Sequence, residues 1–504
     1  MLSTTFSSMR QLGLLLAFTT LMACDDSSQR TTTPPEPEYL PIAQPQVSLP
    51  PDAGSINLLA LNFDLEDVGY RQSEYFLEGT ASAFTNVNSL LADGAWEAEP
   101  SEQATYKTRI VVYRPIDPDE FSGTVIVEWL NVTAGFETPP SWGTGHLEMR
   151  RGGAVWVGVS AQYVGIEGSE NGLLPLHLKA VNPERYGSLV HPGDSYSYDI
   201  FSQVVQALRE PADIDPLDGL IPQRLIAYGE SQSAGRLTAY VNALQPLYNS
   251  FDGYMIHSRG GFSAPLSQAP LPDIPAPEAT RIRTDVNVPV MTFQTETDVV
   301  FLGFTPARQE DTDMIRTWEV AGTAHGDIYT FVTGRDDTVG DPRFASVIEE
   351  NSVLGFISCD QPINNGPHHY VFNTAVRALD AWVTSGELPP PSPRLEINDD
   401  GSDYLYDETG NALGGIRTPY VDAPSAILRG EPNTGAGFCR LFGTTKLLSA
   451  AEMATRYVDE SGYVEAVKDA TEAAVNEGFL LREDADAIIA WAPQQWRNQV
   501  TDSP

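Results

Sequence analysis

Runs of mostly apolar residues alternate with helix-patterned segments through the middle of the chain. Apolar runs bounded by polar or turn residues predict strands at 109–113, 124–129, 154–160, 224–228, 253–257, 289–294 and 316–320. Between several of them, apolar residues recur at helical spacing, which predicts helices at 199–208, 234–244 and 371–383. This alternation favours a mostly parallel sheet with helices on both of its faces.

Two long excursions interrupt the alternation, at about 163–193 and 258–288. Insertions of this kind are typical of lids or substrate walls, although they can also pad the surface. After residue 394 the pattern changes to hairpin strands at 404–406 and 414–416, and then to short helices from 448 to 496. We therefore predict one main domain at 53–394, with lid-like insertions, and a C-terminal extension at 395–504 packed on it.

The N-terminal segment has the layout of a secretory signal, because Arg10 precedes an apolar run at 12–18 that is too short to span a bilayer. The sequence Leu-Met-Ala-Cys at 21–24 resembles a bacterial lipobox. We predict a signal peptide at 1–23 and a lipid on Cys24, with ordinary cleavage as the alternative. Residues 24–52 are rich in Pro, Thr and Ser and predict a tether. The expected location is an exported bacterial lipoprotein, membrane-anchored and facing the periplasm or the cell surface.

Composition supports a folded globular protein and excludes one class of partner. The 504 residues are 41% hydrophobic, enough for a large core. With 68 acidic against 30 basic residues, the net charge of -38 would repel a phosphate backbone, so nucleic acid is excluded as a partner. Of three cysteines, the two that remain after Cys24, Cys359 and Cys439, predict a disulfide in an exported protein. Two buried free thiols are the alternative.

The strongest chemical signal is the segment 225–235, LIAYGESQSAG, in which a strand leads through small residues into a helix. This is the setting of a nucleophile elbow, where a sharp turn exposes a serine hydroxyl to a base and to backbone donors. Gly229 and Ser233 flank Ser231 in the small positions, although the usual pattern has Gly where Ser233 stands. Ser231 is the expected nucleophile. Ser233 as nucleophile, or Ser231 as a plain helix cap, are the alternatives.

A triad that begins with such an elbow continues with an acid and then a histidine, each after a later strand. Glu296 and Asp298 follow the strand at 289–294, and the sequence does not separate them. His325 follows the strand at 316–320 in a loop of small residues and is the expected base. The other histidines are expected to be caps, core donors or substrate contacts: His146, His177, His191, His257, His368 and His369.

An oxyanion site needs two backbone donors. One is expected from Gln232, the residue after the nucleophile, and the other from Asn131 or Val132, after the strand at 124–129. His368 and His369 have no acid or cysteine at ligand spacing, so no metal is expected. Nothing in the sequence indicates a cofactor.

With these residues in place, the chain resembles a family of largely uncharacterised bacterial α/β-hydrolase-domain proteins that are usually exported. The stretches that carry the resemblance include VIVEWLNVTAG, RYGSLVHPGDSYSYDIFSQ, AYGESQSAGRL, WEVAGTAHGD and NNGPHHYVFNTAVRALDAWV, and together they span about residues 55 to 495. The resemblance implies an α/β-hydrolase fold with Ser231 as nucleophile, and it implies that Ser at position 233 is normal. It implies no defined substrate.

The expected function is a serine hydrolase that cleaves a small carboxylic ester or lactone through an acyl-enzyme on Ser231. An acyltransferase or amidase would use the same triad. A cell-surface binding protein on a hydrolase scaffold is the alternative from another class, because a fold does not determine a function. The oligomeric state is not predicted.

Overall fold

A single mixed sheet of nine strands organises the molecule, in the order β1-β2-β3-β5-β4-β6-β7-β8-β9. The computed structural model describes residues 39–355 and 357–501, so the predicted signal peptide, Cys24 and the first part of the predicted tether lie outside the described residues. The strands of this sheet are β1 (Gln46–Ser48), β2 (Tyr70–Asn86), β3 (Ala98–Pro115), β4 (Thr124–Trp129), β5 (Val155–Val159), β6 (Arg224–Glu230), β7 (Gly253–His257), β8 (Val290–Thr295) and β9 (Ile315–Val320).

The half of the sheet that ends in β9 is parallel. Strands β5, β4, β6, β7, β8 and β9 pair in parallel, and their carboxyl ends therefore meet at one edge of the sheet. β1, β2 and β3 add an antiparallel half, joined to the rest through β3 and β5. The predicted α/β-hydrolase fold, with a mostly parallel sheet and helices, is confirmed.

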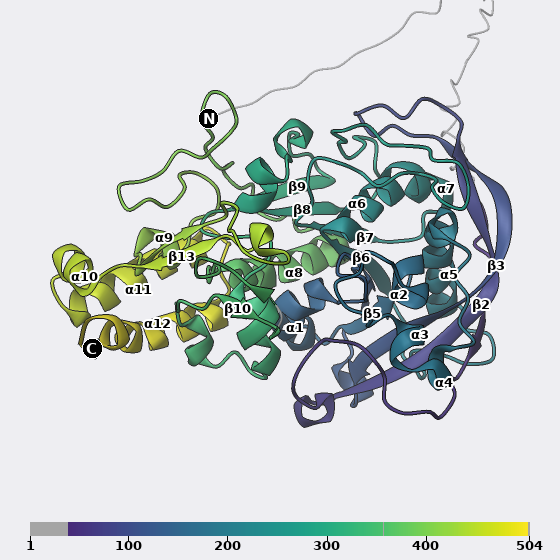
Figure 1. Ribbon diagram of the computed structural model, residues 1–504, viewed down its shortest axis with the longest axis horizontal. Helices are drawn as coiled ribbons and strands as arrows, with labels where there is room; N and C mark the ends of the chain where they lie inside the picture. Colours follow the sequence, from purple (N-terminus) through teal and green to yellow (C-terminus); the bar gives the residue numbers. More distant parts are fainter. Residues whose placement is uncertain (1–38, 356, 502–504) are drawn as a thin grey trace, which may run out of the picture. The chain divides into compact units, whose positions relative to one another are not determined.

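Helices cover both faces of the sheet (Figure 1). Along β4, Val125 and Val127 face a core shared with α5 (Ser197–Arg209) and α6 (Gln232–Ala239), whereas Ile126 faces a core shared with α1 (Pro140–Arg151) and α8 (His368–Ser385). This alternation follows from the two-residue period of a strand. The remaining helices of the first half are short: α2 (Tyr163–Glu167), α3 (Leu178–Val181), α4 (Pro183–Tyr186) and α7 (Gln245–Tyr248).

The C-terminal part forms a further core of its own, in which α10, α11 and α12 pack with β12. Its elements are α9 (Pro419–Asp422), β12 (Ala426–Arg429), β13 (Thr444–Leu447), α10 (Ala450–Tyr457), α11 (Glu460–Asn476) and α12 (Arg482–Trp496). Ile416 continues the main sheet by pairing in parallel with Val320 at the end of β9. In place of the predicted strands at 404–406 and 414–416, the structure has isolated bridges only, among them Leu395 with Gly414.

The predicted tether at 24–52 differs from the structure over its last residues. Gln46–Ser48 form β1, which pairs antiparallel with Phe76, Leu77 and Glu78 of β2. Val47 is buried there in the main core. A proline-rich composition permits extended backbone, and an extended segment at the sheet edge can add a strand. The boundary at residue 52 therefore falls within the folded unit, which begins at Tyr39.

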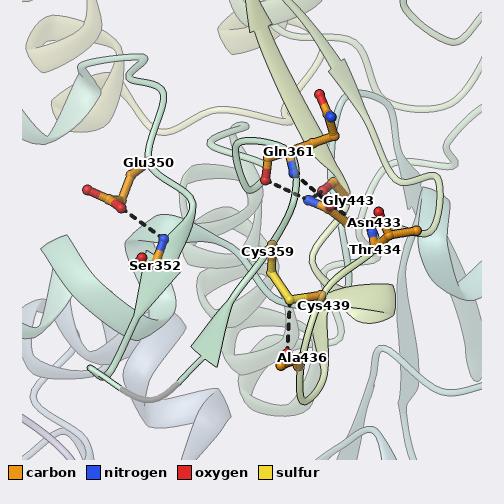
Figure 2. The surroundings of a disulfide bond; sticks show 9 residues. All are labelled: Glu350, Ser352, Cys359, Gln361, Asn433, Thr434, Ala436, Cys439 and Gly443. Carbon is orange, nitrogen blue, oxygen red and sulfur yellow. Dashed lines mark hydrogen bonds between the residues drawn. A yellow bond between two sulfur atoms is a disulfide. The ribbon is translucent and has the colours of Figure 1, made fainter.

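The two cysteines of the described region form a disulfide, as predicted. The sulfur atoms of Cys359 and Cys439 are bonded, and both residues are buried. The bond joins a small hairpin, β10 (Ser352–Val353) and β11 (Ile357–Ser358), to the turn that precedes β13 (Figure 2). Among the residues that the structure describes, no helix is both long and apolar enough to cross a bilayer.

Candidate active site

Ser231 lies at the sharp turn between β6 and α6. Its backbone has φ 58° and ψ -116°, a conformation that L residues rarely adopt. The backbone N–H of Ser231 donates to the carbonyl of His257 at the end of β7, at 2.9 Å, which helps hold the turn. A side chain at Gly229 would meet the carbonyl oxygen of Ser233 at 2.9 Å, so this position of the turn requires glycine.

His325 faces Ser231 from the loop after β9. Its Nε2 lies 2.8 Å from Oγ of Ser231, and its Nδ1 lies 2.6 Å from Oδ1 of Asp298. The backbone N–H of His325 donates to Oγ1 of Thr297, which ties this loop to the loop after β8. The three side chains form a continuous hydrogen-bonded chain from hydroxyl to imidazole to carboxylate. This is the arrangement in which an imidazole can accept a hydroxyl proton.

The structure separates the two carboxylates between which the sequence did not choose. Asp298 is buried, and its second oxygen accepts hydrogen bonds from the backbone N–H and the hydroxyl of Thr295, each at 2.7 Å. The two carboxylate oxygens of Glu296 accept backbone N–H groups instead, those of Gly322 at 2.6 Å and Gly430 at 2.8 Å. Glu296 therefore joins the loop after β9 to the C-terminal part, and of these two carboxylates it is that of Asp298 that contacts the imidazole.

A second carboxylate at the site, that of Glu230, was missed by the sequence reasoning. Its Oε1 lies 3.2 Å from Nε2 of His325, and its Oε2 accepts a hydrogen bond from Nδ2 of Asn131 at 3.1 Å. The signal was visible, because Glu230 directly precedes Ser231 in the elbow. What the sequence does not show is that a strand residue next to the turn points its side chain at the same imidazole.

Burial and nearby charges set the protonation of Glu230 and His325. Burial raises the pKa of Glu230 to about 8, because it disfavours the carboxylate, and the charges of Asp298 and Glu128 act in the same direction. Burial opposes the charged form of His325, but the carboxylates of Glu230 and Asp298 outweigh it and raise the pKa of His325 to about 9. Near neutral pH, Glu230 and His325 therefore hold at least one proton between them.

The backbone donors predicted for an oxyanion have different environments. Gln232 is the first residue of α6, so its N–H has no partner within the helix. The N–H of Asn131 donates to the carbonyl of Thr138 at 2.9 Å and is occupied, while the side chain of Asn131 holds Glu230. Val132 is the next residue of the same loop and is buried. The structure thus engages Asn131 elsewhere and leaves Val132 as the second predicted donor.

The loop that carries Asn131 and Val132 is fastened by buried charges. Arg109 on β3 contacts Glu137 of this loop at 2.5 Å and Glu74 on β2 at 2.8 Å. Arg185, from the first excursion, contacts the other oxygen of Glu74 at 2.7 Å. Arg109 is fully buried, so the position of the loop depends on a paired charge inside the protein.

A pocket opens in front of Ser231 and His325, and its free space is about 650 Å³ when the open solvent at its mouth is included. Most of the described side chains that line it are apolar, and the ionisable ones among them are Glu230 and His325. Leu173 brings the first excursion into the lining of this pocket. The second excursion, 258–288, contributes none of the lining residues.

The other histidines do not converge with His325 on one centre. Nε2 of His257 lies 2.8 Å from Nε2 of His368, whereas the ring of His369 stacks on Tyr329 with 3.5 Å between the ring centroids. His146 and His191 contact the backbone carbonyls of Asp337 and Ala161. Over the described part of the chain, no group of three or more His, Cys, Asp or Glu side chains is placed to hold a metal ion.

The chain was compared with known proteins. A comparison with curated protein sequences found no match. Among solved structures, the chain is similar to an esterase of Rhizomucor miehei, at 13% identity and a TM-score of 0.27, over 50% of this chain and 78% of the other. It is also similar to a glucuronoyl esterase of Solibacter usitatus, at 11% identity and a TM-score of 0.26, over 56% of this chain and 82% of the other.

A family model provides the stronger finding. Residues 42–490 match the model described as the alpha/beta hydrolase domain. The match extends from the residues just before β1 into α12, so it includes the sheet, the turn at Ser231, His325 and most of the C-terminal part. The chain therefore belongs to the alpha/beta hydrolase domain family.

Proposed function

We propose that this protein is a serine hydrolase that cleaves carboxylic esters, with Ser231 as nucleophile, His325 as base and Asp298 as the acid of the triad. The observation that carries the proposal is the hydrogen-bonded chain from Ser231 Oγ through His325 to Asp298, with contacts of 2.8 and 2.6 Å. The position of Ser231 at a strained turn beside the pocket supports the same roles.

In the proposed reaction, His325 Nε2 takes the proton of Ser231 as Oγ attacks the ester carbonyl. The backbone N–H groups of Gln232 and Val132 hold the oxyanion, and the protonated imidazole then gives its proton to the leaving alcohol. Water releases the acyl group from Ser231 in the second half of the reaction, again with His325 as base. Asp298 accepts from Nδ1 of His325 and so maintains the tautomer that presents Nε2 to Ser231.

Labelling of the purified full-length protein with a fluorophosphonate probe, followed by mass spectrometry of the labelled peptide, tests the proposal. We expect the label on Ser231, and we expect the Ser231→Ala and His325→Ala variants to remain unlabelled while keeping the thermal unfolding profile of a folded protein. Ser233→Ala is the matched control and should still be labelled. Label on Ser233, or ester turnover that survives Ser231→Ala, would contradict the assignment.

The binding-protein alternative makes the opposite prediction, namely a folded protein that neither takes the label nor turns over esters. An acyltransferase or amidase would take the label on Ser231 but would give a different product. Product analysis with an ester in the presence and absence of an added alcohol separates these cases, because transfer forms a new ester and hydrolysis forms only the acid.

We further propose that the chain is exported and lipid-anchored through Cys24. The lipobox at 21–24 supports this location, and so does the Cys359–Cys439 disulfide, because such bonds persist in oxidising compartments. In cells fed a labelled fatty acid, the wild-type protein should carry the label and sediment with membranes. The Cys24→Ala variant should carry no label, and retention of label in that variant would place the lipid elsewhere.

A further inference from the structure

One side of the pocket at Ser231 is built by two segments that the disulfide joins. Leu354 and Ile357 come from the β10–β11 hairpin, and Phe438, Leu441 and Phe442 come from the turn before β13. Cys359 follows Ile357 by two residues, and Cys439 directly follows Phe438. We call these five apolar side chains the disulfide-linked wall. Figure 2 shows the bond between the two segments.

Backbone and side-chain hydrogen bonds join the same two segments. The N–H of Asp360 donates to the carbonyl of Thr434 at 2.8 Å. Nδ2 of Asn433 donates to the carbonyl of Gln361 at 2.9 Å, and it also holds its own segment together by donating to the carbonyl of Gly443 at 2.9 Å (Figure 2). Ile357, Phe442 and both cysteines belong to a small hydrophobic cluster that is separate from the two cores of the main sheet. The wall therefore depends on its local cross-links for its shape more than on the main core.

The chemistry of the pocket restricts what can enter it. No Lys or Arg occurs among the described residues that line it, and its two ionisable side chains, those of Glu230 and His325, contact each other beside Ser231. An ionised group moved from water into an apolar pocket without a counter-ion loses its hydration and gains no partner. The overall charge of -38 adds to the repulsion of anionic substrates.

We propose that this pocket receives the uncharged, apolar acyl chain of an ester and that the disulfide-linked wall contacts the end of that chain. The inference rests on the proposed hydrolase function and specifies its substrate class. In this arrangement we expect a short acyl group to stay near Ser231, whereas a medium-length chain gains affinity by burying methylene groups against the wall, at about 0.8 kcal/mol for each.

Two substrates that differ only at the chain end test the substrate class. In 4-nitrophenyl heptanoate the chain ends in a methyl group, and in the mono-4-nitrophenyl ester of heptanedioic acid a carboxylate replaces this methyl group. We expect the full-length protein at pH 7 to favour the heptanoate in kcat/KM by at least about 100-fold. Equal rates on the two esters, with turnover that still requires Ser231, would overturn this inference and leave the proposed hydrolase function intact. No turnover of any ester and no fluorophosphonate label would overturn both.

A charged side chain introduced on the disulfide-linked wall tests whether this wall determines the preference for the uncharged ester. Phe438→Arg should reduce the preference for heptanoate by at least about tenfold, mainly by raising kcat/KM for the acidic ester, since the guanidinium can pair with its carboxylate. Phe438→Ala, which removes the same ring without adding charge, should not raise turnover of the acidic ester. Ile221→Arg adds the same charge at a position that is 80% exposed and should change neither substrate. An unchanged preference in a folded Phe438→Arg variant would overturn the placement of the acyl chain against this wall.

Kinetics of a variant without the disulfide test whether this bond shapes the acyl-chain site. In the Cys359→Ser, Cys439→Ser double variant, we expect KM for 4-nitrophenyl heptanoate to rise severalfold, whereas the parameters for 4-nitrophenyl acetate stay within about twofold. The acetate serves as the control for the triad and for the folded fraction, because it has no methylene groups to bury against the wall. An equal loss on both substrates, or no change on either, would contradict a role of the disulfide in the acyl-chain site.

Discussion

The carboxylate of Glu230 lies 3.2 Å from Nε2 of His325, the same ring nitrogen that faces Ser231 Oγ. Two groups with opposite effects therefore compete for one nitrogen. The serine hydroxyl needs Nε2 free to accept its proton, and the glutamate carboxylate stabilises Nε2 in its protonated form. The carboxylate of Glu230, next to the nucleophile, therefore raises the pH above which His325 can act as a base.

We predict that kcat/KM rises with pH and has its inflection at about 9, because burial lowers the pKa of His325 but the carboxylates of Glu230 and Asp298 outweigh it and raise this pKa to about 9. Only the neutral imidazole can accept a proton, so activity is low below this pKa and reaches its plateau above it. Glu230→Gln removes one negative charge and should move the inflection to lower pH by about one to three units. Glu477→Gln, at an exposed position, is the control. An unchanged inflection in Glu230→Gln would show that Glu230 does not raise the pKa of His325.

Asp298→Asn and Glu296→Gln should affect the protein in different ways. Asp298→Asn removes the charge at 2.6 Å from the imidazole and should lower kcat by about 10³- to 10⁴-fold with little loss of stability. Glu296→Gln replaces one of two acceptors of backbone N–H groups by an NH₂ group, so it should lower the melting temperature and largely spare kcat. Kinetics and thermal unfolding of both variants distinguish the roles. Loss of kcat in Glu296→Gln alone would reverse the assignment of the acid.

Ser231→Gly should be more stable than Ser231→Ala. The conformation at residue 231, φ 58° and ψ -116°, is strained for alanine as it is for serine, but glycine adopts it freely. The relief of strain exceeds the greater chain entropy of glycine, and we expect a difference of about 1 kcal/mol in the free energy of unfolding. Denaturant titrations of the two inactive variants measure it. Equal stabilities would indicate that the turn relaxes when the serine is lost.

Arg109→Met should be strongly destabilising, by about 3–5 kcal/mol, since it leaves the buried carboxylates of Glu74 and Glu137 without their shared partner. Arg209→Met removes a half-exposed partner of Asp252 and should cost less than about 1 kcal/mol. Denaturant unfolding of both variants provides the comparison. A small effect of Arg109→Met would mean that the carboxylates become neutral at little cost.

The sequence predicted best those elements whose apolar pattern is uninterrupted. β4 and β7 begin and end at the predicted residues, because each is a buried parallel strand between turn residues. β2 was missed because its 17 residues mix buried and exposed positions without a two-residue period, as expected for a long strand partly outside the core. The helix α1 was also missed, although a proline at its first position is a known start signal.

The order of Ser231, the acid and His325 could be predicted because each follows a strand whose carboxyl end lies at the same sheet edge. The choice between Glu296 and Asp298 could not, since both occupy one short turn and only its three-dimensional path decides which carboxylate faces His325. The contact of Glu230 with His325 could not be predicted for the same reason. Side-chain direction at the ends of strands is set by tertiary packing, and the sequence pattern does not record it.

The Cys359–Cys439 bond has a topological consequence. It closes a covalent ring across a sequence separation of 80 residues, and this ring contains α8, which covers one face of the sheet, and Ile416, which extends the sheet beyond β9. A single proteolytic cut in the exposed segment after α8 would therefore produce two polypeptides that stay covalently joined. Such a nicked molecule would keep α8 against the sheet and would reveal the cut only on a reducing gel.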